Sequence, residues 1–210
     1  MNNTTLKKII SETQSSPYIK WNDESLLDII NSDSVFSGYI YNKFSEGFAG
    51  YFALLHNLTS NIDGTIVELG NREGLGILSI YDALSENSEL YTLDIVDDVR
   101  FINDKIKSDS RVKILNDFDA LDSDRVSKTF EKKSISMIFL DTIHTYEQVL
   151  AEFILWEPYM KDDCVMLIDD IRPSMAGRTK WRFHTELGYT YKYDVTEWAH
   201  NDTGFGVYLK

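Results

Sequence analysis

The chain has 210 residues, of which 43% are hydrophobic, so one domain with at most a small appendage can bury a sizeable core. Its 34 acidic residues against 21 basic ones give a formal net charge of −13, which argues against a nucleic-acid partner. Cys164 is the only cysteine, which excludes an intrachain disulfide and a thiolate metal site. No segment approaches the roughly 20 apolar residues needed to cross a bilayer. We therefore expect no membrane partner and a cytoplasmic location.

The first 60 residues contain at least two helical patterns and no convincing strand. The clearest apolar face is formed by Phe48, Tyr51, Phe52, Leu55 and Leu58. We interpret residues 1–60 as a helical cap over the functional site, which could also form a homo-oligomer contact. An equally good interpretation is that this segment only covers the edge of the sheet.

Residues 66–76 form a glycine-rich turn between an apolar run and an apolar, helix-like continuation, with the sequence Ile-Val-Glu-Leu-Gly-Asn-Arg-Glu-Gly-Leu-Gly. This pattern is typical of a loop that binds a nucleotide-type ligand after a buried strand. Gly70 allows the chain to turn at the strand end, while Gly74 and Gly76 allow the backbone to approach a ligand and the sheet. We refer to residues 70–76 as the glycine loop.

The acids of this segment indicate the charge of the ligand. A pyrophosphate needs bare amides at a helix N-terminus, but Glu68 lies at the strand end and Glu73 lies within the loop. These acids suit a ligand that carries positive charge, such as S-adenosylmethionine. They disfavour a dinucleotide such as NAD, and the absence of a following Gly-Lys-Ser/Thr disfavours a phosphate-binding loop.

A second candidate ligand follows the next strand-like run, residues 90–94. Asp94 stands 24 positions after Gly70, close to the spacing of about 20 at which an acid meets a ribose diol. We predict that Asp94 binds the ribose. This acid alone does not distinguish S-adenosylmethionine from NAD.

Short apolar runs alternate with helical patterns along the rest of the chain. The expected strands are residues 65–69, 90–94, 112–116, 135–141 and 164–169. An apolar stripe from Tyr146 to Ile154 predicts a helix before the last of them. This alternation predicts an α/β fold, a Rossmann-like doubly wound three-layer sandwich. Residues 189–195 and 204–209 read as two strands that pair antiparallel, which gives a seven-stranded, mostly parallel sheet with an antiparallel C-terminal strand.

The glycine loop, Asp94, Asp117 after the third strand and the C-terminal strand pair resemble a class I S-adenosylmethionine-dependent methyltransferase. The resemblance covers roughly residues 45–210, and we expect residues 61–210 to form the cofactor-binding domain. The cofactor ligands that we predict are Glu68, Gly70, Gly74, Gly76, Asp94, Asp117 and Phe118. Asp117 would accept from the adenine amino group and Phe118 would pack on the adenine ring; the alternative is a loop acid beside a core phenylalanine.

A more specific resemblance comes from residues 139–147 together with residues 165–170. They are similar to a branch that contains bacterial macrolide-sugar and aminocoumarin O-methyltransferases and cephalosporin hydroxylase-like proteins, whose members often bind magnesium. That branch commonly shows Asp-x-Asp-His-x-Tyr-Glu, and here Ile143 occupies the second aspartate position. The resemblance implies methylation of a small-molecule hydroxyl, on a sugar or another secondary metabolite in natural product biosynthesis.

Three acids fall at the carboxyl ends of the fourth and fifth expected strands. Asp141 ends the fourth, and Asp169 and Asp170 end the fifth, where open α/β sheets bind ligands. Three such acids without a lysine or arginine between them repel one another unless a cation sits there, and all-oxygen ligation selects a hard ion such as Mg²⁺. The alternative is that one of them caps a helix or pairs with Arg172.

Asp141 and His144 are the predicted catalytic residues, with His144 placed to take a proton from a substrate hydroxyl. An equally good interpretation is a histidine that is hydrogen-bonded into the start of the helix.

A basic run downstream contains Arg172, Arg178, Lys180 and Arg182, and we interpret it as a solvated loop rather than as a set of ligands. Two other functions stay open beside the methyltransferase. One is an NAD-dependent oxidoreductase, which the acidic loop disfavours. The other is a non-catalytic ligand-binding or assembly module on the same fold, which the replacement of an acid by Ile143 keeps open.

Overall fold

The computed structural model describes residues 1–17, 19–23, 26, 50–172, 180–196 and 204–210. Seven strands form one sheet: β1 (Gly64–Leu69), β2 (Ser88–Leu93), β3 (Val112–Leu115), β4 (Ile135–Leu140), β5 (Met160–Asp169), β6 (Tyr191–Asp194) and β7 (Phe205–Leu209). The helices described are α1 (Asn3–Ser15), α4 (Gly50–Thr59), α5 (Leu75–Asp82), α6 (Asp104–Ser108), α7 (Ser123–Thr129), α8 (Tyr146–Trp156) and α9 (Trp181–Glu186), with a 3₁₀ turn at Glu157–Tyr159.

The strand order is β3-β2-β1-β4-β5-β7-β6. The strands β1 to β5 pair in parallel, and β7 lies antiparallel between β5 and β6. This arrangement confirms the predicted mostly parallel, seven-stranded sheet with an antiparallel C-terminal strand. The largest difference in strand bounds is at β5, which begins at Met160 rather than at residue 164.

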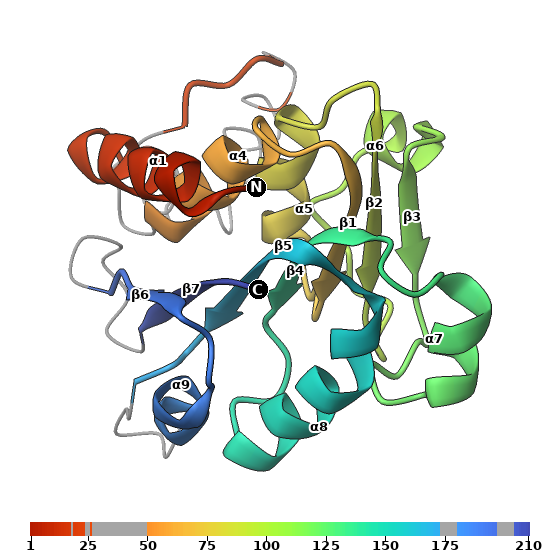
Figure 1. The fold of residues 1–210 in the computed structure, drawn as a ribbon. Coiled ribbons are helices and arrows are strands. Elements are labelled where there is room, and N and C mark those ends of the chain that lie inside the picture. Colours follow the sequence, from red (N-terminus) through yellow and green to blue (C-terminus); the bar gives the residue numbers. More distant parts are fainter. Residues whose placement is uncertain (18, 24–25, 27–49, 173–179, 197–203) are drawn as a thin grey trace.

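Helices cover both faces of the sheet (Figure 1). One core cluster joins α1, α4, α5 and α6 to one face, and the second joins α7, α8 and α9 to the other. Strand β4 explains why the sequence of a central strand is apolar throughout: Met137 and Phe139 enter the first core, while Ile138 and Leu140 enter the second.

The described helices of residues 1–60 belong to the first core. Tyr51, Phe52, Leu55 and Leu58 are buried in it, and α4 packs against α1 and α5. Phe48 lies outside the described residues. The described helices thus cover a face of the sheet, while a cap over the site and an oligomer contact stay predictions.

Two expectations from composition can be compared with the fold. Cys164 is a free, buried thiol, and its burial raises the pKa of the thiol to about 12. In the described part of the chain, no helix has the length and apolar character that crossing a membrane requires.

Candidate cofactor and acceptor site

The site lies at the carboxyl ends of the parallel strands, which point toward the same edge of the sheet in Figure 1. Backbone hydrogen bonds join the loops at this edge. Gly70 N donates to Leu93 O at 2.8 Å, Asp141 N donates to Leu69 O at 2.8 Å, and Phe118 N donates to Asp94 O at 2.9 Å. The loops that follow β1, β2, β3 and β4 are therefore held together before any ligand binds.

Each glycine of the glycine loop is required for a different reason. Gly70 has φ +88°, and a Cβ there would overlap the backbone oxygen of Asp141. Gly74, with φ +97°, is the N-cap of α5, and a Cβ would lie 2.7 Å from Ile102. A Cβ on Gly76 would overlap the carboxyl of Glu68. The loop therefore packs directly on the neighbouring strand ends.

Glu68 lies beneath the start of α5 with only 1% of its surface exposed. Its Oε2 accepts a hydrogen bond of 2.7 Å from Thr92 Oγ1. Burial raises the pKa of Glu68 to about 8, against the lowering effect of the Thr92 bond, and the charge of Asp94 raises it further. A cation bound nearby would favour the ionised carboxylate.

Asp94 holds two loops through its carboxylate. Oδ2 accepts from Arg72 N at 2.9 Å, and Oδ1 accepts from Val96 N at 3.0 Å. A carboxylate offers about four lone-pair sites, so these two bonds leave acceptor capacity for a ribose diol. The side chain is half-buried, as a ligand contact requires.

The predicted adenine contacts lie next to Asp94. Asp117 is exposed and has φ +55°, and its backbone oxygen accepts from the Arg125 guanidinium. Phe118 is only 2% exposed, and the guanidinium carbon of Arg125 lies 4.2 Å from its ring centroid. An adenine that stacked on this face of Phe118 would have to displace Arg125. Stacking of adenine on Phe118 stays a prediction, and no pattern in the sequence indicated the position of Arg125.

The three predicted strand-end acids converge. Burial raises the pKa of Asp141 well above its usual range, and the charges of Asp169 and Asp170 raise it further. Burial also raises the pKa of Asp169, followed by the charge of Asp170. We call Asp141, Asp169 and Asp170 the acid cluster.

Lys180 corrects the premise that no basic residue stands among these acids. It is only 1% exposed, and its Nζ donates to the backbone oxygen of Asp169 at 2.9 Å. Its charge lowers the pKa of both Asp141 and Asp169. Our interpretation of Lys180 as part of a solvated loop was wrong, because the start of α9 packs against the end of β5.

The other described residues of the basic run contact acids outside the acid cluster. Arg172 pairs with Asp194 at 2.8 Å, so the structure does not bear out its pairing with the acid cluster. Arg182 pairs with Glu186 at 2.8 Å and lies over the ring of Tyr146. Arg178 lies outside the described residues. No pattern in the sequence separated Lys180 from these neighbours.

His144 lies against the acid cluster and, within the described part of the chain, is not hydrogen-bonded into the helix start. Its Nδ1 lies 2.7 Å from Asp170 Oδ2, a distance that would make an ion pair if the ring were protonated, although the atoms are not aligned for a hydrogen bond. The N-cap of α8 is Thr145, whose side chain accepts from Gln148 N at 3.3 Å. Ile143, at the position of the family's second aspartate, is 59% exposed and carries no charge to the cluster.

A further buried acid lies behind the cluster. Glu152 of α8 accepts from Thr142 Oγ1 at 2.6 Å and from Gln148 Nε2 at 2.8 Å. Burial raises the pKa of Glu152, while these hydrogen bonds and the charge of Lys180 lower it. Lys180 therefore lies in the field of both Glu152 and the acid cluster, and Thr142 links Glu152 to the loop that carries Asp141 and His144.

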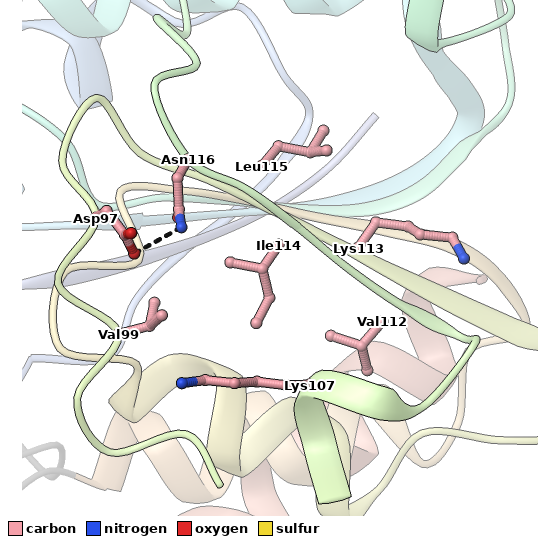
Figure 2. Close-up of a pocket in the computed structure, with 8 residues that line it drawn as sticks. All are labelled: Asp97, Val99, Lys107, Val112, Lys113, Ile114, Leu115 and Asn116. Carbon is pink, nitrogen blue, oxygen red and sulfur yellow. Dashed lines mark hydrogen bonds between the residues drawn. The ribbon is translucent and has the colours of Figure 1, made fainter. Parts of the chain in front are cut away.

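A separate pocket of about 510 Å³ opens between α6 and the edge strand β3 (Figure 2). It is lined by Asp97, Val99, Lys107, Val112, Lys113, Ile114, Leu115 and Asn116. Figure 2 shows Asn116 Nδ2 donating to Asp97 Oδ1, at 2.7 Å. None of the predicted site residues lines this pocket, so it is distinct from the site at the strand ends.

A family model described as a methyltransferase domain matches residues 67–171, which is half of the chain. The matched segment contains the glycine loop, Asp94 and the acid cluster, and it ends before Lys180. No curated protein sequence matches the chain.

Several solved structures are similar in fold. The O-methyltransferase TomG from Streptomyces achromogenes, in complex with SAM, has a TM-score of 0.63 at 16% identity, covering 100% of this chain and 98% of that one. An O-methyltransferase from Bacillus cereus in complex with SAH has a TM-score of 0.59 at 12% identity, covering 100% and 91%. A methyltransferase from Geobacter sulfurreducens has a TM-score of 0.58 at 15% identity, covering 76% and 77%. At these identities, the similarity establishes the fold.

Proposed function

The chain belongs to a family of methyltransferase domains, and on that premise we propose that it transfers the methyl group of S-adenosylmethionine to a hydroxyl of a small molecule. One observation carries the proposal. The backbone of Arg72 in the glycine loop is hydrogen-bonded to the carboxylate of Asp94, beside the loop that carries Asp141. A nucleoside ligand and a reactive centre would therefore lie next to each other at one edge of the sheet.

The cofactor assignment draws support from the similar structures from Streptomyces achromogenes and Bacillus cereus, which contain SAM and SAH. In this chain, Gly70, Gly74 and Gly76 would admit the cofactor, with Asp94 on the ribose. Glu68 adds a carboxyl whose ionisation a cationic ligand favours. Asp117 and Phe118 stay the proposed adenine contacts.

The chemistry would be an in-line displacement, in which the hydroxyl oxygen bonds to the methyl carbon while the sulfur–carbon pair returns to sulfur. His144 is the proposed base that takes the hydroxyl proton, and Asp170 at 2.7 Å would stabilise the resulting imidazolium. Asp141 would orient the acceptor hydroxyl. The protein chiefly aligns the nucleophile with the methyl group.

Magnesium assistance is the finer part of the proposal. Asp141, Asp169 and Asp170 would hold the ion, because all three offer the oxygen ligands that Mg²⁺ prefers. Three ionised carboxylates would repel one another at this place, and a divalent cation would lessen that repulsion. Among the described residues, however, no three acidic, histidine or cysteine side chains stand in an arrangement that could hold an ion, so loading requires rearrangement. A bound ion would lower the pKa of the acceptor hydroxyl.

The acceptor we propose is a sugar or another secondary metabolite, and the excess of acidic residues disfavours a nucleic acid. An NAD-dependent oxidoreductase is not favoured, because the acids at Glu68 and Glu73 oppose a pyrophosphate. A homo-oligomer through the N-terminal helices stays a prediction.

Titration calorimetry with S-adenosylhomocysteine and, separately, with NAD tests the proposal. We expect S-adenosylhomocysteine to bind and NAD to give no saturable heat. Binding of NAD alone would overturn the methyltransferase assignment. Binding of S-adenosylhomocysteine without methyl transfer to any of a panel of hydroxylated sugars and phenols would favour the non-catalytic module.

A further inference from the structure

Glu152 is a fully buried acid in the interior of a helix. It belongs to α8 and is 0% exposed. Its Oε1 accepts from Thr142 Oγ1 at 2.6 Å and from Gln148 Nε2 at 2.8 Å, whereas its Oε2 has no hydrogen-bond partner among the described residues. Burial disfavours a charged carboxyl, and an oxygen without a partner adds to the penalty. An apolar side chain would avoid both penalties, so stability alone does not account for an acid at this position.

The helix that carries Glu152 is held in place along its buried face. Trp156, one turn later, is 0% exposed and donates its Nε1 to Ala120 O at 2.8 Å. Val149, three residues earlier, is also 0% exposed. Residues three and four apart share one face of a helix, so this face fixes α8 against the core and the loop after β3. From this fixed face, the Glu152 carboxylate reaches Thr142, ten residues earlier in the chain.

The connecting segment, residues 142–144, lies between the end of β4 and the N-cap of α8. Its middle residue, Ile143, is 59% exposed, so apolar packing does not fix it. The Nδ1 of His144 is not aligned for a hydrogen bond. Among the described residues, the aligned side-chain hydrogen bond of this segment is the one from Thr142 to Glu152. This bond therefore limits how far the connecting segment can move.

We propose that Glu152 is a positioning residue for methyl transfer. Through Thr142 it holds the connecting segment so that Asp141 and His144 face the acceptor hydroxyl. The inference rests on the proposed function, in which these two residues orient the acceptor and take its proton. Glu152 itself is buried and acts only through Thr142. Because transfer depends on the alignment of the nucleophile with the methyl group, a loosened segment lowers turnover and leaves cofactor affinity unchanged.

The competing explanation is that Glu152 acts through its charge. The charge of Lys180 lowers the pKa of Glu152, so the two side chains interact electrostatically. Glutamine at position 152 separates the two explanations. It keeps the oxygen that accepts from Thr142 and Gln148, and it removes the negative charge that acts on Lys180.

The test measures kcat with an acceptor from the panel of hydroxylated sugars and phenols, together with S-adenosylhomocysteine affinity by calorimetry. We expect Glu152→Leu to lower kcat by roughly 10- to 100-fold, because the base and the orienting acid are no longer held in line. Its affinity for S-adenosylhomocysteine should equal that of the parent. Glu152→Gln should restore most of the parent kcat. Glu131→Leu, at an exposed position, is the matched control and should behave as the parent does.

Thr142→Val removes the same hydrogen bond from the other side and serves should Glu152→Leu fold poorly. It should lower kcat as Glu152→Leu does. The double variant should lose no more than the larger of the two single losses, because both changes break one interaction. Hydrogen exchange gives a readout that needs no acceptor: the amides of the connecting segment should exchange faster in Glu152→Leu and Thr142→Val, and at the parent rate in Glu152→Gln.

Four results would overturn the inference: a kcat of Glu152→Gln as low as that of Glu152→Leu, additive losses in the double variant, a parallel loss of S-adenosylhomocysteine affinity, or parent-like exchange of the connecting segment in Glu152→Leu. The first would assign the effect to charge, and the third would assign it to a general loss of structure. If the parent methylates none of the panel, the proposed function fails. If the parent methylates an acceptor and both Glu152→Leu and Thr142→Val keep its kcat, only this inference fails.

Discussion

Replacement of Lys180 by methionine should expose how strongly the acid cluster depends on one buried cation. Methionine preserves most of the apolar stem and removes the ammonium, which donates to Asp169 O at 2.9 Å. Removing one partner of a buried charge pair costs about 3–5 kcal/mol. We expect about 3 kcal/mol, at the low end of that range, because the direct hydrogen bond goes to a backbone oxygen.

The loss should depend on pH in a defined direction. Burial already raises the pKa values of Asp141, Asp169 and Glu152 above their unfolded values, and Lys180 lowers all three. Without Lys180 these pKa values rise further in the folded state, while the pKa values of the unfolded chain do not change. Ionising the acids therefore destabilises the folded state more as the pH rises above the ordinary carboxyl range. The destabilisation should therefore be small at about pH 5 and larger at about pH 8.

Urea unfolding of the parent and Lys180→Met at both pH values measures this effect, with exposed Lys128→Met as the matched control. The control should stay within about 0.5 kcal/mol of the parent. Lys180 does not stabilise the acid cluster if the free energy of unfolding of Lys180→Met equals that of the control at about pH 8. The same conclusion follows if the destabilisation of Lys180→Met becomes smaller as the pH rises.

Three further predictions concern the cofactor, the base and the metal. Asp94→Ala should weaken S-adenosylhomocysteine binding by about 1.5–3 kcal/mol in calorimetry, because a charge-assisted bond to the ribose is lost; equal affinity in variant and parent would refute the ribose assignment. His144→Ala should lower kcat by about 10²- to 10⁴-fold in a methyl-transfer assay with an identified acceptor, with cofactor affinity unchanged; full activity would eliminate the histidine base. Chelation with EDTA should stop methyl transfer while leaving cofactor binding largely intact, because the proposed cofactor residues lie at the ends of β1 to β3 and in the segments that follow them. Activity that survives exhaustive chelation would eliminate magnesium assistance.

The cofactor side of the site could be anticipated from sequence because its determinants are local. Gly70 and Gly74 adopt positive φ values that other residues rarely tolerate, so their identity reports the shape of the loop directly. Asp94 follows its strand immediately, and a parallel sheet brings such strand ends to one edge. The same rule placed Asp141 beside Asp169 once β4 and β5 were neighbours.

The electrostatic partners were decided only by tertiary structure. Lys180 reaches Asp169 because α9 begins against the end of β5, and His144 reaches Asp170 across 26 positions of sequence. Nothing in the spacing of these residues predicts either contact, because charged side chains are compatible with both a solvated loop and a buried pair.

In the glycine loop, some features follow from the local sequence and others follow only from the tertiary structure. The sequence by itself determined the α/β architecture and the turn, because apolar periodicity and glycine dihedrals act over a few residues. Whether the Asn71 side chain would be exposed, or buried with no hydrogen-bond partner among the described residues, depended on how the loop packs against the ends of β2 and β4. Burial and hydrogen-bond satisfaction arise from groups brought together across the fold, so only the tertiary structure decided them.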